Sequence, residues 1–173
     1  MNQSFLLELV PRGVVALRTI RTEDNENLRL WKNANRFSFF FQEIITPEMQ
    51  ARWFGEYLAR ADDYMFIALH RHAAIGCMGF RMLDGKADIS NVILGCEDLG
   101  GRGLMGQALR LMCSFIQSNF TCAIRLDVLR DNPAVDWYRA NGFIETALHE
   151  TYCELTLDAA RFQVRGFERL DMM

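Results

Sequence analysis

Glycines are concentrated at one point of this 173-residue sequence, between an extended segment and a long amphipathic helix. Gly100, Gly101, Gly103 and Gly106 all lie within the segment 100–106. Glycine lets the backbone approach a ligand closely, and the first turn of a helix presents free N–H groups with partial positive charge. The segment therefore predicts a loop that binds a pyrophosphate, to which Arg102 can add a charged contact.

The helix predicted after this loop has one apolar stripe, made of Leu104, Ala108, Leu111 and Phe115. Ser114 falls on the side expected to face water. Extended segments stand before and after the helix, over Ala87–Leu94 and Ala123–Leu129. Because a strand–helix–strand unit places its two strands side by side in the same direction, these strands are expected to be parallel neighbours.

The middle of the chain has the pattern of antiparallel strands joined by tight turns. Strands are expected over Tyr64–Leu69, Ile75–Leu83 and Ala87–Leu94. Arg71-His72 would turn the first pair, and Asp84-Gly85 is typical of a type I′ hairpin turn. The fold class is therefore α+β, with a mixed, mostly antiparallel sheet, one parallel βαβ unit and flanking helices.

The remaining elements are marked by capping residues. A strand over Val14–Ile20 precedes a helix for which Thr22 is the expected N-cap, and Thr46-Pro47 begins a second helix. Pro133 opens a short helix that ends near Asn141-Gly142. At roughly 150 residues per domain, residues 1–173 make one domain, with a core over about 14–155 and no assignment for 156–173.

Charge and composition exclude several function classes. Nineteen basic residues against 22 acidic ones give a net charge of −3, which provides no basic face for nucleic acid. There is no polybasic run for a membrane surface and no apolar run of about 20 residues to span a bilayer. The segment Met1–Glu8 has no basic region of the kind that begins a signal peptide, so a cytoplasmic protein is expected.

The five cysteines indicate neither disulfides nor a metal. Their number is odd, no pair has C-x-x-C spacing, and His70 and His72 do not complete a zinc ligand set with any of them. We expect buried, reduced cysteines and no metal ion.

Two phosphate-binding motifs fit the glycine segment poorly. A Walker A loop requires Lys and Ser or Thr where Gln107-Ala108 stand. Gly101, Gly103 and Gly106 do spell G-x-G-x-x-G, and Asp127 follows at about the 20-residue spacing of a ribose-binding acid. In dinucleotide folds, however, the glycines follow their strand at once, and an antiparallel meander does not precede them.

Two motifs together resemble the GNAT N-acetyltransferases, and in particular the branch of the ribosomal-protein N-terminal acetyltransferases. The segment from Gly101 to Leu109 resembles the acetyl-CoA loop of that family, and the segment from Asp131 to Phe143 is similar to its second signature. The order of elements also matches, so the resemblance covers about 17–143. In two places the chain departs from the family: Gly100 stands where Gln or Arg is usual, and the stretch before Tyr138 is one residue short, so that either Asn132 or Asp131 takes the family Asn position.

The resemblance implies direct transfer of an acetyl group from acetyl-CoA to a primary amine. Tyr138 matches the residue that usually protonates the departing thiolate. Asp127 lies where N-terminal acetyltransferases often place a Glu that acts as the general base, although a water relay would need no such residue. Asp127 could equally be a structural partner of Arg125 or Arg130. The residues implied to bind the cofactor are Ile93, Leu94, Gly95, Gly101, Arg102, Gly103, Leu104, Met105, Gly106, Asn132 and Tyr138.

The acceptor is the least determined part. It is expected near the first two helices, where Phe37, Phe39, Phe40 and Phe41 either pack in the core or stack on a ligand. A small-molecule amine, an amino sugar and a protein N-terminus all remain open. So do a non-catalytic CoA-binding module and a dinucleotide-binding protein, and an uncovered edge strand near the C-terminus could form a homodimer.

Overall fold

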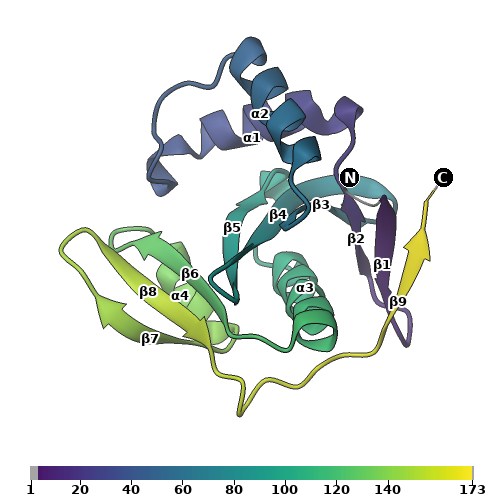
Figure 1. Ribbon diagram of the computed structural model, residues 1–173, viewed down its shortest axis with the longest axis vertical. Coiled ribbons are helices and arrows are strands. Elements are labelled where there is room, and N and C mark those ends of the chain that lie inside the picture. Colours follow the sequence, from purple (N-terminus) through teal and green to yellow (C-terminus); the bar gives the residue numbers. More distant parts are fainter. Residues whose placement is uncertain (1–3, 173) are drawn as a thin grey trace.

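The computed structural model describes residues 4–172, which form one nine-stranded sheet with four α-helices (Figure 1). The strands are β1 (Phe5–Leu9), β2 (Val15–Thr19), β3 (Asp63–His70), β4 (Ala73–Leu83), β5 (Lys86–Leu94), β6 (Ile124–Leu129), β7 (Phe143–Leu148), β8 (Tyr152–Leu157) and β9 (Phe167–Asp171). The helices are α1 (Asn25–Ala34), α2 (Pro47–Ala59), α3 (Leu104–Phe120) and α4 (Ala134–Ala140).

The strand order in the sheet is β7-β8-β6-β5-β4-β3-β2-β1-β9. Every pair is antiparallel except β5 and β6, which run parallel, as the strand–helix–strand pattern predicts. The expected turn residues also adopt the required backbone: Arg71, His72, Asp84 and Gly85 all have positive φ. The α+β prediction, with a mostly antiparallel sheet and one parallel pair, is confirmed.

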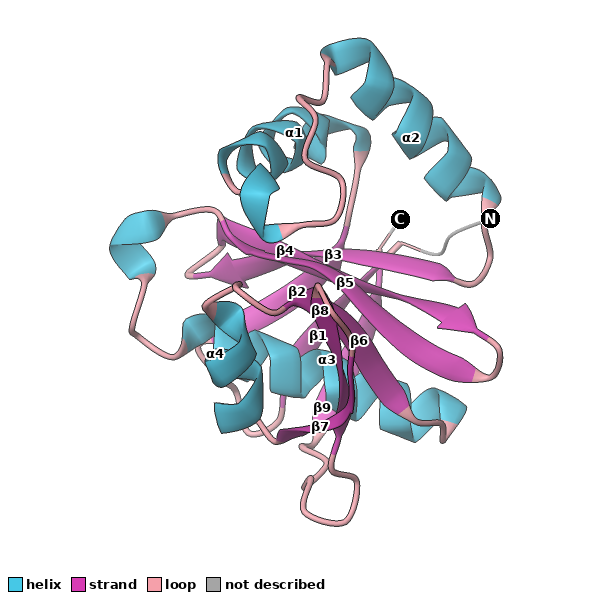
Figure 2. Cartoon of the chain, turned by 90° about the vertical axis from the view of Figure 1, so that its left-hand side faces the viewer, coloured by secondary structure: helices cyan, strands magenta, loops and turns pink. Residues whose placement is uncertain are grey.

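The two faces of the sheet carry different helices (Figure 2). Helices α1 and α2 pack together on one face, over a small cluster that includes Leu28, Tyr57 and Ile67. Helix α3 packs on the other face, where its buried stripe meets the larger core. No helix among residues 4–172 is long and apolar enough to cross a membrane.

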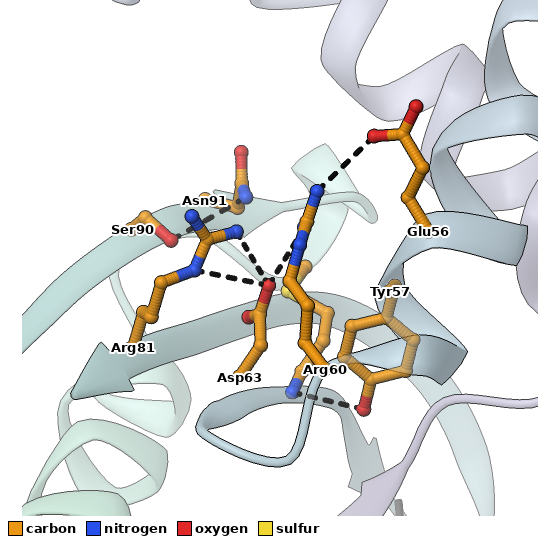
Figure 3. A network of polar contacts seen from close by, with 8 residues as sticks. Glu56, Tyr57, Arg60, Asp63, Arg81, Ser90 and Asn91 are labelled. Carbon is orange, nitrogen blue, oxygen red and sulfur yellow. Dashed lines mark hydrogen bonds and ion pairs between the residues drawn. The ribbon is translucent and has the colours of Figure 1, made fainter. Parts of the chain in front are cut away.

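The end of α2 is fixed to the sheet by a polar network (Figure 3). The carboxylate of Asp63 on β3 accepts hydrogen bonds from Arg60 at 3.0 Å and from Arg81 of β4 at 2.6 Å. The hydroxyl of Tyr57 accepts a hydrogen bond from the backbone N–H of Met65 at 3.3 Å. These contacts hold α2 over the strands and so define one wall of a pocket described below.

Two expectations about polar residues are wrong, and both fail because of tertiary contacts. Thr22 lies within a short 3₁₀ turn and is no cap; the carboxylate of Asp24 accepts the N–H of Arg21 at 2.7 Å instead, because Asp24 is held there by Arg18. Ser114 does not face water but is fully buried. Its hydroxyl accepts the N–H of Arg165, since the segment after β8 crosses that side of α3.

The sheet also extends beyond the segments assigned from sequence. Strand β1 pairs with β2, and its Phe5 and Leu7 are among the most buried side chains, although both precede residue 14. Strand β8 is inserted between β6 and β7, and β9 pairs with β1. The buried core therefore begins nearer the N-terminus than the expected boundary, and the edges of the sheet are β7 and β9.

Candidate active site

The centre of the sheet is interrupted by a bulge in β5. The pairing of β4 with β5 shifts register between Cys77 and Gly79, opposite Asn91, whose φ is +52°. A left-handed conformation is uncommon for a residue other than glycine, and here the carbonyl of Asn91 accepts a hydrogen bond from the buried Cys77 thiol at 3.3 Å. The bulge changes the course of β5 beside β6.

Strands β5 and β6 consequently separate after a short parallel contact. They pair only at Ala87 with Ile124 and at Asp88 with Arg125. Beyond this point a cavity of about 680 Å³ lies between them, lined by residues 88–94 of β5, 126–128 of β6, and the beginning of α4. We call it the β5/β6 cavity. One edge of β5 is thus left without a strand partner and is open to a ligand.

The glycine loop lies beside this cavity and begins α3 without a side-chain cap. Gly101 and Gly103 have φ of +72°, and Gly103 is the N-cap residue. A Cβ atom added to either would meet nothing within 4 Å. The first N–H groups of the helix have no partner within it and carry the positive end of the dipole, so this geometry suits an anion.

A second cavity of about 300 Å³ lies over that helix terminus. Gly101, Gly103, Leu104, Met105 and Gly106 line it, as expected, whereas the exposed Arg102 does not. It shares Val92, Leu94, Ala134 and Tyr138 with the β5/β6 cavity. The two spaces are therefore adjacent, and we call the pair, which reaches from the helix terminus into the sheet, the channel.

The last two residues of β5 and the glycine that follows them have different positions relative to this channel. Ile93 and Leu94 line the β5/β6 cavity. The N–H of Gly95 donates to the carbonyl of Ile75 at 2.8 Å, and a Cβ at Gly95 would clash with the Trp31 ring, so Gly95 lies outside the channel. Because N–H groups alternate along a strand, that of Leu94 points to the opposite side, toward β6.

Tyr138 lies where the two cavities meet. Its side chain is 8% exposed and forms edge-on ring contacts with Trp137 and Phe143. Burial raises the pKa of its phenol well above the ordinary value of 10. The hydroxyl therefore keeps its proton at neutral pH and is available as a donor.

Asp127 also lines the β5/β6 cavity, but its carboxylate is engaged. Arg125 donates to it at 2.7 Å and lies 3.2 Å from Asp88 on the neighbouring strand. Burial raises the pKa of Asp88, and the positive charge of Arg125 opposes that shift. The three side chains form a charged cluster on the cavity wall.

Asn132 lines the cavity while the exposed Asp131 does not. The side-chain Oδ1 of Asn132 accepts the N–H of Ala134 at 2.9 Å, and its side-chain Nδ2 donates to the backbone carbonyl of Ser38 at 3.0 Å. Asn132 thus bonds to the first residue of α4 and connects that helix to the segment that follows α1. Of the two candidates for the family Asn position, Asn132 is the one beside the channel.

Some lining residues carried no recognisable signal in the sequence. Asn91 is one, because nothing nearby marks a bulge. Lys32 of α1 also lines the cavity, and its ammonium donates to the Asn91 side chain at 2.8 Å. Phe37 and Phe40, 67% and 58% exposed, do not pack in the core, and Phe40 lines the β5/β6 cavity. Among residues 4–172 no group of His, Cys, Asp and Glu is arranged to hold a metal ion.

Comparison with known proteins decides the family. The sequence profile of the acetyltransferase (GNAT) domain matches residues 15–143. The chain belongs to the GNAT acetyltransferases. This confirms the resemblance of its two motifs, and makes the chain an acyltransferase by family. No curated protein sequence matches it significantly.

Solved structures with this GNAT fold resemble the chain at low sequence identity. The ribosomal L7/L12 α-N-protein acetyltransferase RimL, solved with coenzyme A, is 16% identical, with a TM-score of 0.68 over 95% of this chain and 98% of that one. FdhC, a nucleotide-linked sugar GNAT, is 14% identical, with a TM-score of 0.73 over 86% and 89%. Spermidine N-acetyltransferase from Vibrio cholerae, with CoA and spermine, is 16% identical, with a TM-score of 0.68 over 90% and 95%. At these identities the likeness shows the fold.

Proposed function

We propose that this protein is an acetyl-CoA-dependent N-acetyltransferase that transfers the acetyl group directly to a primary amine. The observation that carries the proposal is the channel, whose two adjacent cavities lie at the uncapped N-terminus of α3 and at the unpaired edge of β5. A pyrophosphate fits the first element, and an extended, amide-containing arm fits the second, since such an arm can hydrogen-bond to a strand edge.

The residues present fit acetyl-CoA. The N–H groups of Leu104, Met105 and Gly106 would hold the pyrophosphate, with Gly101 and Gly103 leaving room for it. Ile93 and Leu94 would bind the pantetheine arm along β5. Bound there, acetyl-CoA supplies an activated thioester to an amine.

Leu94 and Tyr138 would serve the transfer itself. The N–H of Leu94 points into the open side of β5, where it can stabilise negative charge on a carbonyl oxygen. Tyr138 holds its proton at neutral pH and can donate it to a departing thiolate. The attacking amine must be neutral, so a proton has to leave it first.

Two routes could take this proton from the amine: the Asp127 carboxylate or a chain of water molecules. Asp127 lines the cavity and could accept it, although its carboxylate already accepts a hydrogen bond from Arg125 at 2.7 Å. A water relay to solvent is the alternative. The variant Asp127→Asn distinguishes the two: a relay through water predicts a pH–rate profile of unchanged shape.

Ligand-induced thermal stabilisation tests the channel. A ligand at 100 times its Kd adds about 2.7 kcal/mol to stability. We expect acetyl-CoA and CoA to raise Tm, and NAD to leave it unchanged. Gly103→Asp places a carboxylate where the pyrophosphate would lie, so the shift should disappear. Gly85→Asp is the matched control, because Gly85 has a similar φ of +73° and equally open space but lies in the β4–β5 turn.

The outcome separates the candidate functions. A shift with NAD alone contradicts the acetyltransferase proposal, as does full acetyl-CoA affinity in Gly103→Asp. If Tyr138 is the acid, Tyr138→Phe should lower kcat about tenfold or more while leaving acetyl-CoA affinity intact. Binding of CoA with no acetylation across amino acids, amino sugars, polyamines and peptides would indicate a non-catalytic CoA-binding protein.

A further inference from the structure

Another cavity lies on the face of the sheet that α1 and α2 cover. It has a volume of about 280 Å³ and is enclosed by α1, α2 and the segment between them. We call it the α1–α2 pocket. Its wall is mostly apolar and includes Leu28, Phe41, Ile45, Met49 and Trp53. The polar network of Asp63 and Arg60 holds the end of α2 against the sheet (Figure 3).

This pocket meets the β5/β6 cavity at the bulge. Lys32, Phe41, Asn91 and Ile93 line both spaces. A molecule seated in the α1–α2 pocket can therefore extend past Asn91 toward Leu94, where the proposed function places the acetyl group. The position is that of an amine acceptor, and the inference below rests on the proposed function.

The α1–α2 pocket and the β5/β6 cavity differ in the charged side chains that line them. No carboxylate lines the α1–α2 pocket among residues 4–172, and Lys32 is its one cationic side chain. The three carboxylates nearby, Asp88, Glu97 and Asp127, line the β5/β6 cavity only. An acceptor that spans the junction thus meets a positive charge at the pocket and negative charges further along the channel.

Lys32 has little to compensate its charge. Its ammonium donates to the Asn91 amide oxygen at 2.8 Å and lies 3.2 Å from the centre of the Phe39 ring. No ion pair with a carboxylate is formed by Lys32 in the described structure. Lys32 is partly buried, and a partly desolvated ammonium without a counter-ion is costly. A ligand that brings an anion would reduce that cost.

We propose that the acceptor is a monoamine with an apolar body and an anionic oxygen group. The apolar body fills the α1–α2 pocket, the anionic group binds Lys32, and the amine lies toward the carboxylates of the β5/β6 cavity. Polyamines fit poorly, because they would place a second cation beside Lys32 with no carboxylate to pair it.

Matched ligand pairs test this assignment without requiring turnover. L-leucine, L-phenylalanine and L-tryptophan are compared with isoamylamine, phenethylamine and tryptamine, which lack only the carboxylate, and with spermidine. Binding is measured by thermal shift on protein saturated with CoA, so that no acetyl group is transferred. We expect at least one amino acid to bind at least tenfold more tightly than its decarboxylated partner, and spermidine to bind more weakly than that amino acid.

Variants at the two lysines assign the preference to Lys32. Lys32→Met keeps the length of the side chain and removes the charge, so the preference for the carboxylate should disappear. Lys86→Met is the control, since Lys86 is exposed at the β4–β5 turn and should leave the preference unchanged. The CoA-induced shift in each variant shows that it is folded. If Lys32→Met does not fold, the ligand pairs in the wild-type protein still decide the question.

Three results would overturn the inference: equal or tighter binding of all the decarboxylated amines, tighter binding of spermidine, or a preference that survives in folded Lys32→Met. Failure of the proposed function gives a different pattern. Binding preferences as predicted, with no acetylation when acetyl-CoA replaces CoA, would support the pocket assignment and contradict catalysis.

Discussion

The partly buried ammonium of Lys32 should make the stability of this protein depend on pH, and removing the ammonium should abolish that dependence. Burial lowers the pKa of Lys32 from 10.5 to about 8, and the nearby Cys77 thiol acts weakly in the opposite direction. Below pH 8 the lysine is charged in both the folded and the unfolded state, and folding carries the full desolvation cost. Between pH 8 and 10.5 the folded state loses the proton first, so the unfolded state binds more protons and the free energy of unfolding rises with pH.

The size of the effect follows from the shift. One pKa unit corresponds to 1.36 kcal/mol, so between pH 7 and pH 9.5 the wild-type protein should gain about 2 kcal/mol relative to Lys32→Met. Groups that titrate in both proteins, including the cysteine thiols, contribute equally to the two pH dependences and cancel in the comparison. Burial raises the pKa of Cys77, the thiol near Lys32, to about 12, so this thiol stays protonated in the folded state.

Urea denaturation at both pH values, with a reducing agent for the free cysteines, measures this difference. The m-values of the two proteins should agree, so that a change of midpoint reports stability alone. A stability difference that stays the same from pH 7 to pH 9.5 would show that Lys32 is not desolvated. That result would also remove the electrostatic reason for an anionic acceptor group.

Three further variants test the packing by urea denaturation at neutral pH. Asp24→Ala leaves the partly buried guanidinium of Arg18, which donates to Asp24 at 2.8 and 2.9 Å, without its carboxylate partner, and should cost about 3 kcal/mol. Leu111→Ala opens a cavity under α3 at a fully buried position and should cost about 2–5 kcal/mol. Ser114→Ala deprives the Arg165 N–H of its acceptor and should cost about 1–3 kcal/mol, whereas a cost near zero would show that the segment after β8 is not held there.

The elements that were predictable have local causes. The strands around Asp84-Gly85 follow from alternation and from a turn pair that tolerates positive φ, and α3 follows from its apolar stripe. Thr46 caps α2 as predicted, accepting the N–H of Met49 at 3.3 Å, because Pro47 fixes the first helical residue. In each case the deciding interaction lies within a few residues.

The errors have causes that lie far away in the sequence. Ser114 has the polarity of a surface residue, and only the return of the chain over α3, about 50 residues later, buries it against Arg165. Strand β1 is a short apolar segment that is fixed by β2 and by β9, its partner at the opposite end of the chain. No periodicity in a short window contains such information.

The candidate site divides in the same way. The glycine loop was located because clustered glycines carry the signal. The bulge at Asn91 was not, because a single asparagine tolerates a φ of +52° but is equally at home in other conformations. Gly95 was assigned to the channel from the family pattern, yet the ring of Trp31, from α1, covers it. Contacts between distant segments decide which neighbours along β5 face a ligand.

The bulge connects the two halves of the proposed reaction. It opens β5 toward β6, which leaves a strand edge for the cofactor arm, and it places the Asn91 side chain on the opposite side, where it holds Lys32 over the acceptor pocket. Regular pairing of β4 with β5, without the bulge, would require one residue fewer in β5. Deleting Asn91 should therefore close the channel and release Lys32 together, so that acetyl-CoA affinity and the preference for an anionic acceptor are lost in one variant.

Asn91→Ala keeps the backbone and removes only the amide, so it should weaken the acceptor preference and leave the CoA-induced thermal shift intact. Equal loss of both properties in Asn91→Ala would refute this division of roles between the backbone and the side chain.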